Sequence, residues 1–136
     1  MDNSHSYLKW SLLSGAAYFL LVAGTYFLGH KVPFLNIYYD LPSIPYEDKI
    51  ISFSALGWSM FFVGGYSSTK RGSLRSVRYI VLACAGAVGM LCFINFFGDL
   101  RAQYGSVNYF VYWVETGLLA VYTAWLAILY EIAKKT

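Results

Sequence analysis

Four long apolar segments dominate this sequence and limit what it can fold into. They cover residues 8–28, 48–66, 77–97 and 108–132. A helix of about 20 apolar residues crosses the roughly 30 Å hydrocarbon core of a bilayer. The sequence therefore predicts an all-α fold, a four-helix transmembrane bundle that occupies residues 1–136 as one integral membrane domain. An outer loop is expected over residues 30–47.

The charged residues are few and lie mainly between the apolar segments. Only 12% of the residues are charged, about half of the usual share in a soluble domain. Ten Lys and Arg residues against seven Asp and Glu residues leave a net charge of +3. No basic stripe alternates with exposed aromatic side chains, as it would in a nucleic-acid-binding protein. We therefore expect membrane lipids as partners and exclude nucleic acid.

The basic residues are divided unequally between the two sides of the predicted membrane domain. Seven would lie on the side of the termini and segment 67–78, and three on the other side. Since Lys and Arg collect in cytoplasmic loops, both termini are predicted in the cytoplasm, or in the matrix of a mitochondrion. We expect a bacterial inner membrane, with the mitochondrial inner membrane as the alternative. The seven are Lys9, Lys70, Arg71, Arg75, Arg78, Lys134 and Lys135, and the three are Lys31, Lys49 and Arg101.

Segment 67–78 is predicted to be a short basic loop. Its basic residues, Lys70, Arg71, Arg75 and Arg78, would fix the orientation of the chain in the membrane. The alternative is that they bind anionic lipid or an acidic partner.

All three prolines of the chain, Pro33, Pro42 and Pro45, fall in the loop of residues 30–47. Proline lacks a backbone donor and restricts the residue before it, so this segment is not a continuous helix. Its aromatic side chains suit the headgroup level of a membrane. Two interpretations stay open, a structured cap over a cavity and a plain loop at the interface. The aromatic residues are Phe34, Tyr38, Tyr39 and Tyr46.

Helical spacing assigns contact faces to the first three helices. In the third, Ala85 and Gly89 form a small-xxx-small pair, so we expect this helix to be the most buried of the four. Small and weakly polar residues mark the faces at which the first and second helices should meet a neighbour. These faces are Ser11, Gly15, Tyr18, Val22 and Thr25 in the first helix and Ser54, Gly57, Phe61 and Gly64 in the second. Leu12, Leu13, Phe19 and Leu20 are expected to face lipid.

Glu115 lies well inside the fourth apolar segment. An ionisable side chain at that depth is costly unless it is paired, hydrated or neutralised, so it marks a function or a contact between helices. Asn108, Glu115 and Tyr122 are spaced seven residues apart, which places them within about 20° of one another around a helix axis. They predict one polar stripe that faces the interior of the bundle.

The end of the third helix supplies residues that could meet this stripe. Because a short loop joins the third and fourth helices, we expect them to be antiparallel neighbours. Asn95 and Asp99 would then lie near Glu115, with Tyr112 as a further member and Arg101 as the counter-charge. A pair of Glu115 with Arg101 would fix two helices, whereas an unpaired Glu115 beside an apolar cavity would serve as a general acid or proton relay. We favour the structural role, because the membrane span holds no second acid.

Metal and redox sites are not expected. Cys84 and Cys92 are eight residues apart, roughly 12 Å along a helix, whereas the Cα atoms of a disulfide are roughly 4.4–6.8 Å apart. The two histidines, His5 and His30, form no motif with them. We predict no metal and no cofactor, unless a quinone or lipid is bound.

Four features together resemble the DoxX-like group of small four-helix bacterial membrane proteins. They are a long first outer loop, a basic inner loop Lys70-Arg71-Gly72-Ser73-Leu74-Arg75, a small-residue third helix and Glu115 in the fourth helix. The end of the third helix, Asn95–Arg101, stands where relatives often have a Gly-Arg pair, and here the arginine comes later. The resemblance implies a protein of a largely uncharacterised group, in which some members look like subunits of quinone-linked oxidoreductases.

These features leave three functions open, of which we favour the first. It is a non-catalytic multi-pass subunit that assembles with other membrane subunits, or with copies of itself, and stabilises a larger complex. The second is a binding protein or small enzyme for an apolar ligand such as a quinone, isoprenoid or lipid, with Glu115, Asn95 and Tyr112 at the site. The third is an oligomeric transporter or channel. An enzyme is the less expected class, because the sequence shows no catalytic set.

Overall fold

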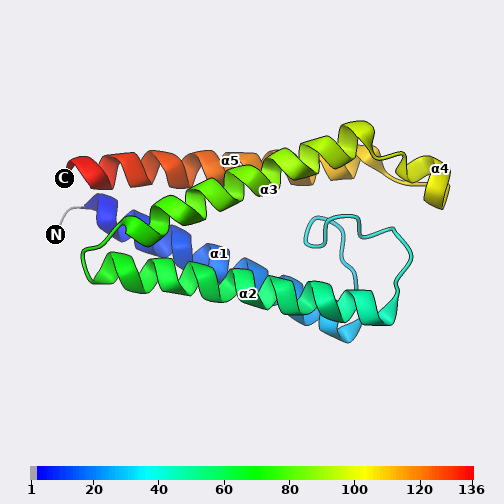
Figure 1. Cartoon of the computed structure of the whole chain (residues 1–136), viewed down its shortest axis with the longest axis horizontal. Coiled ribbons are helices and arrows are strands. Elements are labelled where there is room, and N and C mark those ends of the chain that lie inside the picture. Colours follow the sequence, from blue (N-terminus) through cyan, green and yellow to red (C-terminus); the bar gives the residue numbers. More distant parts are fainter. Residues whose placement is uncertain (1–2) are drawn as a thin grey trace.

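Each of the four apolar segments forms one continuous helix in the computed structural model, which describes residues 3–136 (Figure 1). These helices, α1 (Asn3–Leu28), α2 (Pro45–Lys70), α3 (Arg75–Phe97) and α5 (Tyr109–Lys135), are each long and apolar enough to cross a membrane. The prediction of an all-α chain with four candidate membrane-spanning helices is confirmed. A short additional helix, α4 (Leu100–Tyr104), lies in the connection between α3 and α5 and was not expected.

The helices extend beyond the apolar segments. Pro45 begins α2 at a position where its missing N–H is not needed, and Glu47 and Asp48 lie in the first turn, where the helix dipole favours acidic groups. The adjacent Gly64 and Gly65 do not interrupt α2, which continues to Lys70. The basic segment 67–78 is therefore mostly helical, and residues 71–74 alone link α2 to α3.

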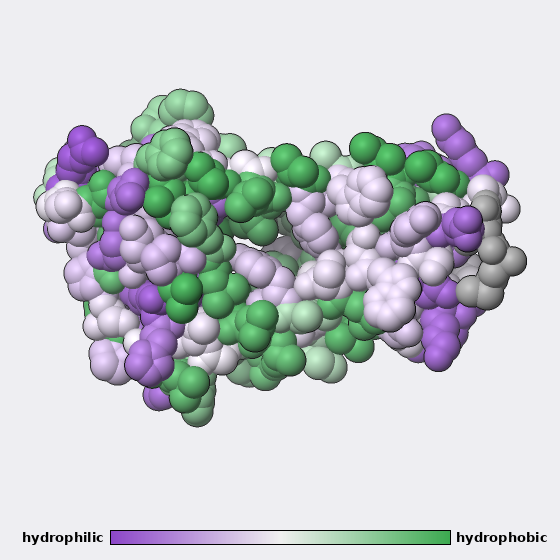
Figure 2. Space-filling model, turned by 180° about the vertical axis from the view of Figure 1, so that it is seen from behind, coloured by the Kyte–Doolittle hydropathy of each residue, from purple (hydrophilic) through white to green (hydrophobic). Residues whose placement is uncertain are grey.

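The four long helices form a closed ring. The neighbours are α1 with α2, α2 with α3, α3 with α5, and α5 with α1. The start of α1, the end of α5 and the link between α2 and α3 lie together at one end, which we call the terminal end (Figure 1). In space-filling view the hydrophilic residues gather at the two ends, with an apolar belt between them (Figure 2).

Tight packing is concentrated toward the terminal end. Leu8, Leu12, Phe62, Ile80 and Leu126 are fully buried there and bring all four helices together. A second, smaller cluster of Val22, Ala23, Tyr26 and Ala55 belongs to α1 and α2 alone. The pair α1/α2 therefore separates from the pair α3/α5 toward the opposite end, which we call the loop end. The long loop of residues 29–44 lies between the two pairs at that end (Figure 1).

A residue that was predicted to face lipid is buried in the protein, and several that were predicted to face another helix are exposed. Leu12 was expected to face lipid and is fully buried. Gly57 and Gly64 have open space beside them, whereas Gly65 packs against Ile80. The prediction that α3 is the most buried helix is wrong, because its apolar stretch has the smallest buried share of the four. Lipid and protein are both apolar, so spacing groups residues into a face without telling which neighbour the face meets.

At Gly15, side chains of α2 and α5 come very close to the backbone of α1. A Cβ atom at this position would lie 2.6 Å from Cδ1 of Phe62 and would also collide with the hydroxyl of Tyr122. Phe62 is fully buried and has no room to move away. Gly24, in the same helix, has nothing within contact distance of the same atom. Glycine at position 15 thus sets the spacing of α1, α2 and α5.

We predict that Gly15→Ala lowers the stability of the purified protein by about 1–3 kcal/mol, the usual cost of overpacking. Gly24→Ala is the matched control and should leave stability unchanged or raise it slightly, because alanine favours a helix. Thermal unfolding in a mild detergent measures both. Equal unfolding midpoints for the two variants would contradict the close packing at Gly15.

Candidate functional site

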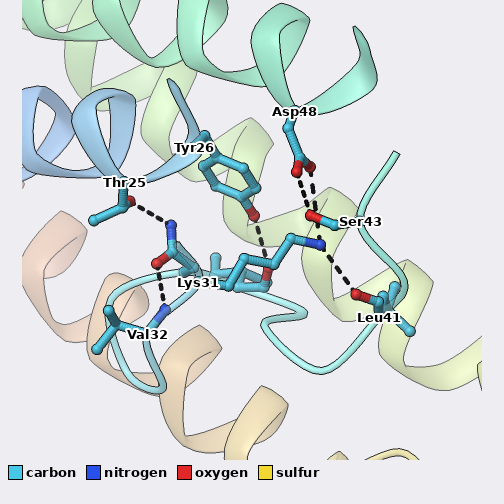
Figure 3. A network of polar contacts seen from close by, with 9 residues as sticks. Thr25, Tyr26, Lys31, Val32, Leu41, Ser43 and Asp48 are labelled. Atoms are coloured by element: carbon cyan, nitrogen blue, oxygen red, sulfur yellow. Dashed lines mark hydrogen bonds and ion pairs between the residues drawn. The ribbon is translucent and has the colours of Figure 1, made fainter. Parts of the chain in front are cut away.

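The long loop is an ordered structure with its own buried polar residue. Gly29 adopts a left-handed conformation (φ 73°) that ends α1, and the N–H of His30 donates to the carbonyl oxygen of Thr25 (2.9 Å). Asn36 is fully buried, accepts from the N–H of Val32 (2.7 Å) and donates to the Thr25 hydroxyl (2.8 Å). The two bonds of Asn36, drawn as dashed lines at Thr25 and Val32 in Figure 3, close residues 32–36 into a compact turn.

An ion pair holds the second half of the loop to the start of α2. The Lys31 ammonium lies 3.9 Å from Oδ1 of Asp48 and donates to the carbonyl oxygen of Leu41 at 3.0 Å (Figure 3). The hydroxyl of Ser43 donates to the other carboxylate oxygen of Asp48. Asp48 is 5% exposed, so the pair is shielded from screening by solvent. The loop is thereby anchored at both of its ends.

Two tyrosines of α1 bind the middle of the loop. The hydroxyl of Tyr18 donates to the carbonyl oxygen of Leu35 (3.0 Å), and that of Tyr26 to the carbonyl oxygen of Ile37 (3.1 Å). Backbone groups of an irregular loop inside a membrane protein need such partners, because lipid supplies none.

The opposite side of the loop binds α3 and α5. The N–H of Phe34 donates to Oε1 of Glu115 (2.8 Å), and the Tyr38 hydroxyl donates to Oδ1 of Asn95 (2.9 Å). The Asp40 carboxylate accepts from the Tyr112 hydroxyl and from the N–H of Asn108 (2.9 Å). The loop therefore joins the two helix pairs at the end where they separate.

Phe34 and Tyr38 have left-handed backbone conformations, with φ values of 65° and 60°. This conformation costs about 1–2 kcal/mol for a residue with a Cβ atom. Both residues also contact α3 or α5, so the cross-links hold the strained backbone in place. Burial and the nearby Glu115 carboxylate raise the pKa of Tyr38 to about 12, so its hydroxyl remains a donor at neutral pH.

A cavity of about 520 Å³ lies beneath the loop, among α1, α2, α3 and α5. Its walls are mainly apolar and aromatic, and a hollow is visible in the middle of the face shown in Figure 2. The loop contributes Phe34 and Ile37 to the lining, which makes it a cap over a cavity, one of the two interpretations left open by the sequence. The helices contribute polar and aromatic lining residues that include Ser14, Tyr18, Phe19, Trp58, Glu115, Tyr122 and Thr123, and the small residue Ala87.

Glu115 is the ionisable carboxyl group of this lining and is 3% exposed. Its Oε1 atom binds the N–H of Phe34 (2.8 Å), and its Oε2 atom is buried without a hydrogen-bond partner among the described residues. An unpaired buried carboxylate oxygen is rare in proteins and calls for a partner that is a ligand, an ion or water.

Four of the seven predicted site residues bind the loop, three through their side chains and Asn108 through its backbone N–H. Asn95, Tyr112 and Glu115 meet the loop, and Asn95 also donates to the Thr116 hydroxyl of α5 (3.0 Å). Tyr122 lies seven residues after Glu115 in α5, about two helical turns farther along the cavity. There its hydroxyl donates to the carbonyl oxygen of Ser11 in α1 (2.6 Å).

Asn108, Asp99 and Arg101 have local roles at the loop end. The side chains of Asn108 and Asp99 cap α5 and α4 by accepting from Val111 (3.3 Å) and Ala102 (3.1 Å). The exposed Arg101 lies over the Tyr109 ring, 5.5 Å from its centroid, and forms no ion pair within residues 3–136. The prediction that Arg101 neutralises Glu115 is wrong, because the cap of α4 turns it away from the bundle.

Sequence reasoning missed the loop residues Phe34, Tyr38 and Asp40 as partners of the polar stripe. Asp40 is an acid that follows Tyr38 and Tyr39 in a proline-containing loop, which is a weak signal for a buried contact. The partner of Glu115 is a backbone N–H, which every non-proline residue carries, so composition and spacing contain no signal for it.

The sequence also singled out four basic residues, two cysteines and the question of a metal site. Lys70, Arg71, Arg75 and Arg78 are exposed at the terminal end and do not line the cavity. Cys84 and Cys92 are free thiols. Within residues 3–136, no group of three or more His, Cys, Asp or Glu side chains could hold a metal ion.

Comparison with known proteins returns no match to a family model, to a curated protein or to a solved structure. The resemblance to the DoxX-like group therefore stays a hypothesis, and the function has to be inferred from the cavity and the surfaces of the bundle.

We predict that Tyr38→Phe loosens the loop, because it removes the donor to the buried Asn95 oxygen. Leaving that oxygen unpaired costs about 1–3 kcal/mol, so the amides of Phe34 and Asn36 should exchange with deuterium about tenfold faster or more. Tyr39→Phe is the matched control, since the Tyr39 hydroxyl takes no part in the bonds to α3 and α5. Unchanged exchange in Tyr38→Phe would show that the loop is held without this bond.

Proposed function

We propose that this chain is an integral membrane protein that binds an apolar, membrane-dissolved molecule inside its helical bundle. The observation that carries the proposal is that Glu115, whose buried Oε2 atom has no hydrogen-bond partner among the described residues, lines an apolar cavity of about 520 Å³. The function favoured from the sequence was a non-catalytic subunit. The cavity gives the ligand-binding alternative the stronger support.

The size and walls of the cavity suit a small lipid-like molecule. Ligand cavities commonly measure about 300–1,000 Å³ and combine apolar walls with a few placed polar groups. Here Phe19 and Trp58 are stacked (centroids 5.4 Å apart) in the wall, while Glu115 supplies the polar group at the loop end. Entry would be sideways from the lipid, through the hollow visible in Figure 2.

Binding is favoured over catalysis. Glu115 is the carboxyl group in the lining, and the lining holds neither histidine nor lysine that could complete an acid and base pair with it. A quinone, an isoprenoid or another lipid fits these walls, and none of them needs a bond to be broken in order to be held.

The distribution of basic residues supports an orientation in the membrane. Seven Lys and Arg residues belong to the terminal end and three to the loop end, which favours termini in the cytoplasm, or the matrix, and the cap on the opposite side. A bacterial inner membrane is the simplest setting, and a mitochondrial inner membrane the alternative. An alkaline phosphatase fused to the C-terminus should be inactive in bacteria, and full activity would reverse this orientation.

Photolabelling tests the binding function. The protein in lipid vesicles is irradiated with a diazirine-bearing sesquiterpene hydrocarbon, and the labelled peptides are identified by mass spectrometry. We predict labels concentrated on the cavity-lining residues of α3 and α5, which are Ala87, Val88, Met90, Leu91, Leu118, Leu119, Tyr122 and Thr123. Labelling that is equal at cavity-lining and lipid-facing positions would contradict a binding cavity.

A pair of variants separates the cavity from the outer surface. Ala87 lines the cavity, whereas Ala85 is exposed on the same helix and does not. Ala87→Phe fills part of the cavity and should reduce this labelling several-fold, while Ala85→Phe should not. Thermal unfolding of both variants confirms that they are folded.

A second candidate function is assembly with other membrane subunits or with copies of this chain. The observation that favours it is the surface of α3, where Ala85, Gly86 and Gly89 are exposed. The two glycines have no neighbour within contact distance of a Cβ atom. Exposed small residues allow close approach of another helix inside a membrane. Binding of a ligand and assembly use different surfaces, so both functions can coexist.

For assembly, we predict that the protein extracted in a mild detergent migrates in blue-native electrophoresis as a complex larger than the monomer. Gly89→Leu should abolish that complex, because a leucine side chain keeps the helices apart. Gly117→Leu, at an equally open glycine of α5, is the control. Migration of the unaltered protein only as a monomer would count strongly against this function.

A further inference from the structure

We propose that the ligand is an apolar alcohol or phenol, whose hydroxyl group binds Glu115. This inference rests on the proposed binding function and names the chemical class of the ligand. It follows from two observations. The hydroxyl groups of the cavity lining already donate to backbone carbonyl oxygens, and the Oε2 atom of Glu115 has no partner among the described residues.

The two carboxylate oxygens of Glu115 have different environments. Oε1 accepts from the backbone N–H of Phe34 at 2.8 Å, which ties Glu115 to the loop. Oε2 is buried and has no partner among the described residues. The residue as a whole is 3% exposed, so bulk water does not reach it freely. A bound molecule has to supply the missing hydrogen bond.

The hydroxyl groups in the cavity wall do not supply it. Each hydroxyl hydrogen is already donated to a backbone carbonyl oxygen. Ser14 and Tyr122 donate to Ser11 (2.8 and 2.6 Å), Tyr18 to Leu35 (3.0 Å) and Thr123 to Leu119 (2.8 Å). These four groups can only accept a further bond, so a ligand that also only accepts gains nothing from them.

A hydroxyl group matches Glu115 in either protonation state. It donates to Oε2 when Glu115 is ionised, and it accepts from the carboxylic acid when Glu115 is neutral. A ketone, ester or ether can only accept, and so fits only the acid. A carboxylate or phosphate head group is disfavoured, because among residues 3–136 the cavity wall has no Lys, Arg or His side chain to balance its charge.

The shape of the cavity places the hydroxyl at one end of the ligand. Along α5 the lining extends from Glu115 to Thr123, roughly 12 Å of helix. Glu115 lies at the loop end of this stretch, and apolar side chains of α3 and α5 follow it toward the terminal end. A molecule with a polar head and an apolar body would therefore lie along the bundle axis with its hydroxyl under the loop.

The test compares an alcohol with its methyl ether as competitors of the photolabelling described above. Farnesol and farnesyl methyl ether have the same carbon chain, and only farnesol can donate. With Glu115 ionised, we expect farnesol to displace the sesquiterpene probe at about 10- to 100-fold lower concentration, the effect of one hydrogen bond to a buried charged group. Cholesterol and 4-nonylphenol, each against its own methyl ether, identify which carbon skeleton the cavity accepts.

Glu115→Gln assigns the preference to Glu115. The glutamine carbonyl can still accept from Phe34, but its amide presents a donor to the cavity in place of Oε2. The advantage of the alcohol should fall to within about threefold, and the ether should bind better than it does to the unaltered protein. Glu131→Gln changes an exposed carboxylate outside the cavity and should keep the full preference.

The outcomes separate this inference from the proposed function. Displacement by every alcohol and its ether at equal concentration, with labels still in the cavity, overturns the alcohol or phenol ligand and keeps binding. Tighter displacement by farnesylamine than by farnesol likewise overturns it, in favour of a cationic ligand. Labels absent from the cavity overturn the binding function itself. The comparison of alcohol and ether uses the unaltered protein, so it stands even if Glu115→Gln fails to fold.

Discussion

The hydrogen bond between the N–H of Phe34 and Glu115 is the contact on which the loop end of this protein depends. A carboxylate inside a bilayer is costly, and a backbone N–H in an irregular loop needs an acceptor that lipid does not provide. The N–H of Phe34 donates to the Oε1 atom of Glu115 at 2.8 Å, so each group has the hydrogen-bond partner that it needs. Together with Tyr38 to Asn95 and Asp40 to Tyr112, this bond joins two helix pairs that share no apolar core at that end.

The cavity is a consequence of the same arrangement. The buried leucines and Phe62 hold four helices together near the terminal end, whereas the small cluster around Tyr26 holds only α1 and α2. The helix pairs diverge from the packed end, and the loop covers the space between them rather than filling it (Figure 1). Glu115 belongs to both regions, because its Oε1 atom binds the loop and the residue lines the cavity. Any change in the loop would thus be felt at the proposed ligand site.

The energetic cost of placing a polar group at membrane depth identified more residues of the site than the search for an oppositely charged partner did. Glu115 and Asn95 were identified because polar groups at membrane depth need a reason to be there, and both lie in the polar contacts under the loop. Arg101 was assigned to Glu115 because it is the nearest cation in the sequence. It instead follows the cap that Asp99 gives to α4 and lies over Tyr109. Nearness in sequence says little about nearness in space once a short helix turns the chain.

The sequence by itself determined the four apolar helices, because length, hydropathy and helical period are local properties. Only the tertiary structure decided which faces meet. Leu12 and Leu21 have the same side chain and lie in the same helix, yet Leu12 is fully buried and Leu21 is 62% exposed. In a bilayer both surroundings are apolar, so hydropathy cannot tell protein from lipid, and shape alone makes the choice. The partner of Glu115 also depends on the path of the loop. Every non-proline residue has a backbone N–H, so the sequence does not show which one lies beside Glu115.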